Sequence, residues 1–410
     1  MRLAIARFSA YGFLKNQRYF EPFLALALLS WGASFAQIGL LVGLRELVRN
    51  LFEVPSGAVA DLWGRRRAMV LAFSVYPLGV ALMPLGGQEH PWLWGVAMGC
   101  LGLGDAFRSG THKALVFAWL QQQGRAAERT KVYGYTRSWS RLGSAASIPL
   151  GVGLLLVTKD YAWTFWATCV PWTLDLINLA TYPRELEGAR EERRARGVGR
   201  HLLAALREVL GRRRLRRLLL DAAAFEGVHK ATKEYLAPAL LVGLGMGELD
   251  LGAAGVGASF VGAVYFATHL LGAAASRRAY RVEAWLGGGD EALARLGAGL
   301  VGAMALAAAG AWVPALTAAG LVAAAWLHDL FRPVLVGRID AESQAVGKAT
   351  VLSLESQGSS LTAVLLAPAV GLAVDQARAL ASGRGLWAVG LVGGLVALSL
   401  LRPRGGARRR

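Results

Sequence analysis

Long apolar runs alternate with short polar, mostly basic segments along the whole chain. The hydrocarbon core of a bilayer is about 30 Å thick, so about 20 helical residues are needed to cross it. Most of the runs are long enough for one crossing, and the run at 296–328 is long enough for two around Pro314. The pattern predicts a polytopic, all-α membrane protein. The uncharged runs are 22–44, 68–88, 142–158, 251–276, 296–328, 356–374 and 385–401.

Basic side chains cluster between and beside these runs. Placing every cluster on one side of the membrane satisfies the positive-inside rule and leaves both termini cytoplasmic. The long basic segment 183–216 then separates a six-helix bundle at 1–182 from a second six-helix bundle at 217–410. Twelve spans are predicted, at 17–35, 38–60, 68–87, 92–116, 132–157, 162–182, 217–243, 251–275, 293–311, 314–338, 348–374 and 385–402.

Composition agrees with a membrane protein and narrows its partners. The chain has 410 residues, of which 55% are hydrophobic, and a formal net charge of +18. Such a charge can indicate nucleic-acid binding, but its placement at the ends of spans makes it a topology signal that also contacts anionic lipid. Nucleic acid is therefore excluded as a partner. The N-terminal segment lacks the apolar core of a cleaved signal peptide, so we expect the first span to direct insertion.

Charged residues inside the spans follow a three-span period. Spans 3, 9 and 12 have essentially no charge in their interiors, and span 6 has only Asp175. The neighbouring spans carry several charges each. A three-helix unit repeated four times, with every third helix facing lipid, produces such a pattern, and transporter folds are often built from repeats.

A short motif follows the second predicted span, with the sequence GAVADLWGRRR at residues 57–67. It resembles the signature loop between helices 2 and 3 of the major facilitator superfamily, although Leu62 replaces the usual basic residue after the aspartate. The resemblance implies two pseudo-symmetric six-helix bundles and a latch that closes the cytoplasmic side. A glycine in this frame permits close helix contact, and the aspartate can pair with an arginine. The gate-motif residues are Gly57, Asp61, Gly64, Arg65 and Arg66.

Ionisable residues within the spans are the candidates for substrate binding and ion coupling. A charge at mid-bilayer is costly, so it normally faces a cavity or a partner. At 100° per residue, Asp105, Arg108 and His112 fall within an arc of about 60°. The resemblance implies that spans 1, 4, 7 and 10 line a central cavity. The candidates are Glu53, Asp105, Arg108, His112, Glu226, His229, Lys230, His328 and Asp329.

Residue chemistry suggests how these candidates divide their roles. Arg108 and Lys230 are candidates for an anionic substrate group, because arginine offers a bidentate fork and lysine a point charge. The carboxylates Asp105, Glu226 and Glu53 are candidate proton carriers, and the histidines His112, His229 and His328 titrate near neutral pH.

A purely structural interpretation stays open beside these roles. Asp105 with Arg108, and Glu226 with Lys230, have the spacings of intrahelical ion pairs. Lys113 lies off the span 4 arc and is expected to extend towards the inner face. Arg45, Arg49 and Glu53 share a face of span 2, and we expect them to form a charge network with Glu355 or Arg141.

No motif indicates an enzyme, a metal site or a cofactor. The sequence has no phosphate-binding GxxxxGK[ST], no HExxH and no nucleophile elbow. Cys100 and Cys169 fall within spans, which favours neither a disulfide nor a metal site. The segment GSAASIPLG (143–151) faintly resembles the glycine-proline motif of antiporters in the superfamily, although a proline kink with small-residue packing explains it equally well.

The predicted function is secondary active transport in a bacterial-type cytoplasmic membrane by a monomer that alternates access to its site. Its predicted partners are a small-molecule substrate, for which an anionic group is one option, protons and membrane lipid. The GSAASIPLG segment gives a slight preference for efflux. One alternative is a non-transporting sensor or assembly protein with the same fold, and another is a lipid flippase, which would need a largely apolar cavity wall.

Overall fold

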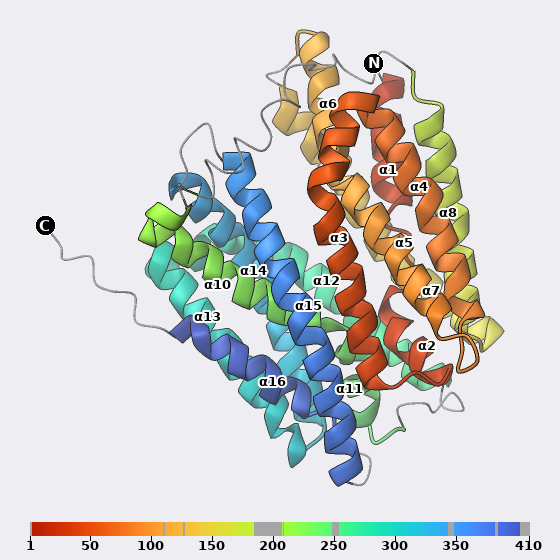
Figure 1. Cartoon of the computed structure of the whole chain (residues 1–410), viewed down its shortest axis with the longest axis vertical. Helices are drawn as coiled ribbons and strands as arrows, with labels where there is room; N and C mark the ends of the chain where they lie inside the picture. The colour runs from red at the N-terminus through yellow and green to blue at the C-terminus, as the bar shows by residue number, and fades with distance from the viewer. Residues whose placement is uncertain are drawn as a thin grey trace, which may run out of the picture. The chain divides into compact units, whose positions relative to one another are not determined.

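The computed structural model describes residues 2–109, 111–125, 128–183, 207, 209–247, 254–342, 348–381 and 384–401. All regular elements in these ranges are helices (Figure 1). Contacts divide the chain into two compact units, called here the first unit (Met1–Arg200 with Met246–His269) and the second unit (His201–Gly245 with Leu270–Arg410). The predicted linker 183–216 lies largely outside the described residues.

In the first unit, helix α5 packs against both α3 and α4, α4 also packs against α8, and α1 packs against α7. The fold thus brings the second, third and fourth predicted spans together. The helices are α1 (Arg2–Leu14), α2 (Leu24–Ser30), α3 (Phe35–Trp63), α4 (Arg65–Leu82), α5 (Trp92–Arg108), α6 (Thr111–Gln122), α7 (Arg129–Thr158) and α8 (Ala162–Ala180).

In the second unit, helix α10 packs against α15 and α14, and α13 packs against α14 and α16. Helix α12 (Ala254–Trp285) crosses the division, because its residues up to His269 belong to the first unit. The other helices are α10 (Arg213–Thr232), α11 (Leu236–Gly243), α13 (Gly289–Ala308), α14 (Ala315–Glu342), α15 (Lys348–Leu380) and α16 (Ala388–Ala397).

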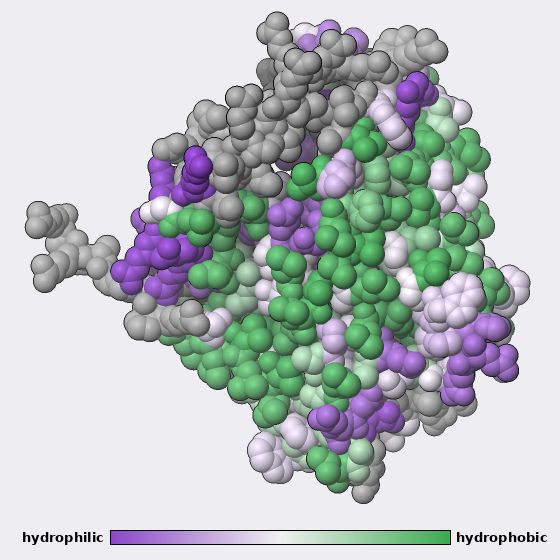
Figure 2. Space-filling model, in the orientation of Figure 1, coloured by the Kyte–Doolittle hydropathy of each residue, from purple (hydrophilic) through white to green (hydrophobic). Residues whose placement is uncertain are grey.

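The outer faces of the helices are apolar. Six helices in the described ranges are long and apolar enough to cross a membrane, by length and composition. Large side chains such as Leu78 on α4, Leu365 on α15 and Leu395 on α16 are more than half exposed. Figure 2 shows apolar side chains over α3 in the first unit and over α15 and α16 in the second. Apolar patches of this extent are unusual on soluble proteins and suit contact with lipid.

In the described residues, the bounds of the first predicted span are wrong. An apolar helix already begins at Arg2, and span 17–35 contains only a 3-10 turn (Glu21–Phe23) and the short helix α2. The chain leaves α1 at Lys15, where the Asn16 side chain donates hydrogen bonds to the carbonyls of Gly12 (2.8 Å) and Ser140 (3.0 Å). A polar side chain thus satisfies the carbonyls at the end of the helix.

Small residues of α7 allow α1 to approach closely. A methyl group at Gly143 would lie 2.4 Å from the carbonyl oxygen of Phe13, and one at Gly151 would lie 2.5 Å from that of Tyr19. Close backbone approach through small residues is a common way to pack membrane helices. It accounts for the glycines of GSAASIPLG without reference to transport direction.

The fourth predicted span is two helices, not one. Helix α5 ends at Arg108, and Ser109 leaves helical geometry with φ −59° and ψ 122°. The Thr111 hydroxyl at the start of α6 donates a hydrogen bond to the carbonyl of Phe107 (2.9 Å). A hydroxyl side chain can in this way replace a lost backbone bond within a membrane. The break separates Asp105 and Arg108 from His112.

Candidate functional site

Four buried or half-buried side chains from α3, α4 and α5 form a continuous hydrogen-bonded set, called here the Asp105 cluster. The Asp105 carboxylate accepts hydrogen bonds from Arg45 (Nη2 2.7 Å, Nε 3.1 Å), from the Tyr76 hydroxyl (2.6 Å) and from Arg108 Nη2 (3.3 Å). The Tyr76 hydroxyl in turn accepts a bond from Arg108 Nε (2.8 Å). One carboxylate is therefore held by two guanidinium groups and a phenol.

The Asp105 cluster fastens three helices of the first unit to one another. Tyr76 can approach because position 104 is glycine, and a methyl group there would lie 2.8 Å from the tyrosine ring. The predicted intrahelical pair of Asp105 with Arg108 is confirmed by their 3.3 Å contact. Arg45 pairs with Asp105, and in the second unit Glu355 pairs with Arg332, so the expected network of Arg45, Arg49 and Glu53 with Glu355 or Arg141 stays a prediction.

His112 lies apart from this cluster, because the break at Ser109 turns α6 towards α1. Its ring stacks on Tyr11 at a centroid distance of 3.7 Å and meets Phe8 edge-on at 5.7 Å. The continuous helix behind the predicted stripe of Asp105, Arg108 and His112 is absent, although Arg108 and His112 both lie beside Tyr11 of α1. The signal that sequence reading missed is Ser109 followed by glycine, since both residues weaken a helix.

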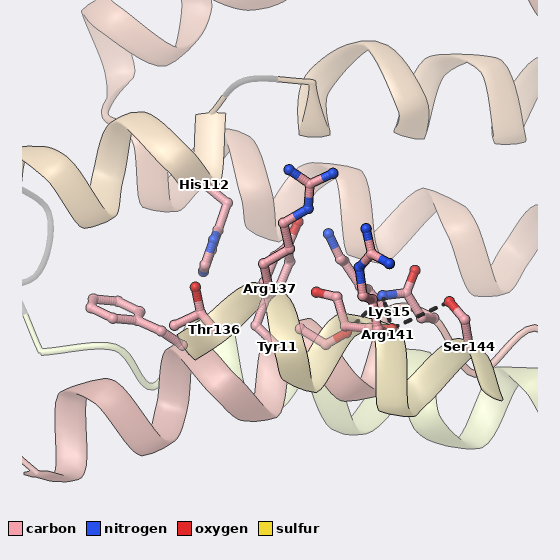
Figure 3. A pocket seen from close by; sticks show the side chains of 11 residues that line it. Tyr11, Lys15, His112, Thr136, Arg137, Arg141 and Ser144 are labelled. Atoms are coloured by element: carbon pink, nitrogen blue, oxygen red, sulfur yellow. Dashed lines mark hydrogen bonds between the residues drawn. The ribbon is translucent and has the colours of Figure 1, made fainter. Parts of the chain in front are cut away.

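A cavity of about 390 Å³ opens beside His112 in the first unit. Figure 3 shows Lys15 from the end of α1 and Arg137 and Arg141 from α7 extending to the same side, with His112 projecting towards them. We call it the basic cavity. It is lined by Phe8, Tyr11, Gly12, Lys15, Asn16, His112, Thr136, Arg137, Ser140, Arg141 and Ser144.

Five side chains of the second unit form a second group, called here the Glu226 cluster. Glu226 on α10 lies 3.0 Å from His328 Nε2 and 3.6 Å from Arg332 Nη1, both on α14. Arg332 Nη1 also donates a 2.7 Å hydrogen bond to Glu355 on α15. The His229 ring stacks on that of His328 at 3.9 Å. The structure thus brings together three predicted candidates, Glu226, His229 and His328, and adds Arg332 and Glu355.

The remaining candidates of the second unit lie near this cluster but have other contacts. Lys230 Nζ donates hydrogen bonds to Ser359 (3.1 Å) and Ser360 (2.9 Å) of α15, rather than simply pairing along its helix with Glu226 as its spacing predicted. The Asp329 carboxylate packs against Gly272 of α12, where a methyl group would overlap it. Lys230 therefore joins α10 to α15, and Asp329 joins α14 to α12.

The signature loop makes a sharp turn between α3 and α4. Gly64 has φ 104°, a conformation that glycine adopts readily, and α4 begins at Arg65. Arg66 donates hydrogen bonds to the carbonyls of Ala180 (3.1 Å) and Tyr182 (3.3 Å), which ties the start of α4 to the end of α8.

The predictions for Gly57 and Asp61 of the signature loop, and for the nearby Glu53, concern residues of α3 just before this turn. A methyl group at Gly57 would meet no described atom within 4 Å, and the close helix contact that this glycine permits stays a prediction. The side chain of Asp61 lies outside the described part, so its pairing stays a prediction. The candidate Glu53 is half-buried on α3, and its carbonyl accepts a hydrogen bond from Ser56 (3.0 Å).

Sequence reasoning missed Lys15, Tyr11 and Tyr76. Tyr11 and Tyr76 are neutral and were not selected by a search for charge, while Lys15 was placed before the first span. The apolar stretch Leu3–Leu14 was the available signal that a helix precedes Lys15. No group of three or more His, Cys, Asp or Glu side chains that could hold a metal ion occurs in the described ranges.

Apolar outer helix faces and buried paired charges define a multi-pass integral membrane protein of the transporter class. The chain belongs to the Major Facilitator Superfamily, because the model of that family matches residues 3–347. The class predicted from the GAVADLWGRRR loop, a membrane transporter and not an enzyme, is thereby confirmed.

Individual relatives cover the chain to different extents. The multidrug resistance protein MdtH of Yersinia enterocolitica is 29% identical over 142 residues, which are 35% of this chain and 33% of that protein. The match thus spans about a third of the relative's length. Among solved structures, the nucleoside transporter NupG superposes with a TM-score of 0.75 at 10% identity, covering 97% of this chain and 98% of the other.

A D-xylose-proton symporter superposes with a TM-score of 0.65 at 14% identity, covering 97% of this chain and 96% of the other. Identities this low establish the shared fold and leave the substrate open.

Proposed function

We propose that the protein is a proton-coupled secondary transporter that exports a small molecule across the bacterial cytoplasmic membrane. The Glu226 cluster is the observation that carries the coupling. It places a buried carboxylate at hydrogen-bonding distance from an imidazole, with Glu226 3.0 Å from His328. Histidine has an ordinary pKa near neutrality, so a His–Glu pair can take up and release a proton under physiological conditions.

The surroundings of this pair support the same role. The Glu355 side chain is 0% exposed, and its Oε2 has no hydrogen-bond partner among the described residues. Arg332, 40% exposed, reaches both glutamates and can stabilise either as an anion. Ionisable groups inside membrane helices commonly mark proton or substrate pathways. Glu226 and Glu355 supply two carboxylates, Arg332 one guanidinium group and His328 one imidazole. Adding one proton to this group of side chains changes its net charge by one unit.

Export is the direction favoured by the relatives. The matched MdtH is called a multidrug resistance protein, and resistance implies removal of a compound from the cell. The sequence segment GSAASIPLG no longer adds to this, because its glycines allow close packing against Phe13 of α1 and against Tyr19 beyond it.

Flux measurements in proteoliposomes test the proposal. A panel of drugs and metabolites is offered to the purified protein with and without an imposed pH gradient. We expect at least one compound to be driven against its concentration gradient when protons flow the opposite way. If no compound moves in a gradient-dependent manner through demonstrably folded protein, the transport proposal is wrong.

The variant Glu226→Gln separates coupling from translocation. We expect it to retain exchange of substrate across the membrane without a pH gradient and to lose accumulation driven by the gradient. Glu291→Gln is the matched control, because Glu291 pairs with Arg295 on the surface and its side chain is 66% exposed. Full gradient-driven accumulation by Glu226→Gln would place coupling elsewhere.

A further inference from the structure

The basic cavity of the first unit gathers positive charge with no carboxylate in its lining. Lys15, Arg137 and Arg141 are the cations that line it, His112 lines it as well, and the other seven lining residues have no charged side chain. Lys15 and Arg137 make no ion pair with any described residue. Like charges placed together in a partly buried space repel one another, so such a set is stabilised when an anion enters.

His112 supplies a second, independent indication of a ligand. Its side chain is nine-tenths buried, and Nε2 has no hydrogen-bond partner in the part of the chain that the structure describes. In Figure 3 the ring points from α6 towards Thr136 of α7, next to Arg137. Buried polar atoms are nearly always hydrogen-bonded, so an unpartnered nitrogen that faces a cavity indicates an absent partner.

The nearby carboxylate of Asp175 interacts electrostatically with Lys15 from outside the cavity lining. Asp175 on α8 is fully buried and accepts a hydrogen bond from Asn178 (3.3 Å), and it is not among the residues that line the cavity. The carboxylate of Asp105 is held by Arg45, Tyr76 and Arg108. No carboxylate within the lining therefore pairs with Lys15 or Arg137, and both can bind an anion from outside the chain.

The rest of the lining indicates the shape of that molecule. Phe8 and Tyr11 present aromatic rings on one side, and hydroxyl groups of residues such as Ser140 and Ser144 lie on another. A volume of about 390 Å³ is within the range of pockets that bind small organic molecules. An arginine fork and a lysine ammonium are well suited to a carboxylate, while aromatic walls suit a planar apolar body.

We propose that the basic cavity binds the anionic group of the transported molecule, which belongs to the class of small organic carboxylates with an aromatic or planar body. This inference rests on the transport function proposed above and specifies its substrate. It moves the predicted anion contact from Arg108 and Lys230 to Lys15, Arg137 and His112, because Arg108 is occupied by Asp105 and Tyr76.

Equilibrium dialysis with three matched probes tests the charge preference. The probes are 1-naphthoate, the neutral 1-naphthamide and the cationic 1-naphthylmethylamine, and the full-length protein is held in nanodiscs of phosphatidylcholine. This lipid has no net charge, so no anionic headgroup competes for the cavity. We expect naphthoate to bind more tightly than either other probe by at least about tenfold, the effect of one charge-assisted contact.

The variants Lys15→Gln and Arg137→Gln test whether the tighter binding of naphthoate takes place in the basic cavity. Each is expected to weaken naphthoate binding by about tenfold and to leave naphthamide binding unchanged. Arg137 is exposed on α7, so its replacement remains informative if Lys15→Gln fails to fold. Lys159→Gln, an exposed lysine at the end of α7 and outside the cavity lining, is the matched control and should change neither affinity.

The outcomes distinguish this inference from the transport proposal. Equal binding of the three probes, or variants that bind naphthoate as well as the parent protein, would overturn the anion site even if flux of another compound is observed. Lower naphthoate binding in nanodiscs containing phosphatidylglycerol, with naphthamide unaffected, would show that a lipid phosphate occupies the cavity and would overturn it as a substrate site. Selective naphthoate binding without flux of any compound would leave the anion site standing and count against transport.

Discussion

The Asp105 cluster and the Glu226 cluster are built from similar side chains but balance them differently. In the first, one carboxylate faces Arg45, Arg108 and the hydroxyl of Tyr76. In the second, two carboxylates share Arg332, and one of them also meets an imidazole. A fully paired set of permanent charges fixes helices together, whereas a set that includes histidine can exchange a proton. Buried charge in one chain can therefore serve either rigidity or coupling.

The largest expected effect comes from removing the carboxylate at the centre of the rigid cluster. Asp105→Ala leaves the half-buried guanidinium groups of Arg45 and Arg108 without their partner, and breaking a buried pair in this way costs about 3–5 kcal/mol. We expect a large fall in the yield of monodisperse protein and in its melting temperature. Asp105→Asn, which keeps the shape and part of the hydrogen bonding, should lose less. An unchanged melting temperature in both would show that the cluster does not hold α3, α4 and α5 together.

A smaller effect is expected when Arg332, the cation shared by the two carboxylates of the Glu226 cluster, is removed. Arg332→Gln takes away the hydrogen-bond donor 2.7 Å from Glu355, and a bond to a charged group is worth about 1.5–3 kcal/mol. Partial exposure of Arg332 should bring the loss of stability to the lower end of that range. Thermal melts measure it, and gradient-driven flux should fall as well.

The double variant Arg332→Gln with Glu355→Gln sharpens the test by a double-mutant cycle. We expect the second change to recover part of the stability lost in the first, because no ionised partner is then left behind at position 355. Strictly additive losses would mean that the two residues act independently despite their contact.

A larger side chain at position 104 would crowd Tyr76. We expect this to lower the stability of the folded protein by about as much as Arg332→Gln does. Gly104→Ala places a methyl group 2.8 Å from the Tyr76 ring, and overpacking of this kind costs about 1–3 kcal/mol. Gly99→Ala on the same helix is the matched control, since a methyl group there meets nothing within 4 Å. Alanine favours a helix over glycine, so the control should be neutral or slightly stabilising in a thermal melt. Equal losses from both variants would point to a general effect on α5.

The smallest effect is expected at Lys113, a charged residue outside both clusters. Lys113 is exposed, and its ammonium lies 5.6 Å from the centre of the Phe117 ring. An exposed contact of this type is worth less than about 1 kcal/mol. Lys113→Gln should therefore leave melting temperature and flux close to those of the parent protein. A substantial loss of flux would place this lysine in the transport machinery and remove the distinction between it and the two clusters.

The class of protein and its helices could be predicted from apolar run length, because twenty apolar residues have few alternatives to a membrane helix. The charged candidates could be selected for a related reason, since charges are rare in such helices. Glu226, His229 and His328 were found in this way and lie together. The exposed position of Lys113 was also predicted from its place off the arc.

Partners between helices could not be predicted in the same manner. Arg45 could have met a carboxylate on several spans, and only packing selects Asp105. Helical spacing also could not predict that the helix ends at Arg108 and that Ser109 leaves helical geometry. Tyr76 was invisible to a search for charge, although its hydroxyl joins Asp105 to Arg108.

The interruption after Arg108 has a consequence for how the sequence can vary. Within a continuous helix, inserting one residue rotates everything beyond it by about 100° and would turn one set of functional groups away from its partners. Residues up to Arg108 are held by α3 and α4, whereas His112 is held by Phe8 and Tyr11 of α1. A length change at the junction near Ser109 can be absorbed there, so each half keeps its register. The two halves of this span are in that respect free to diverge separately.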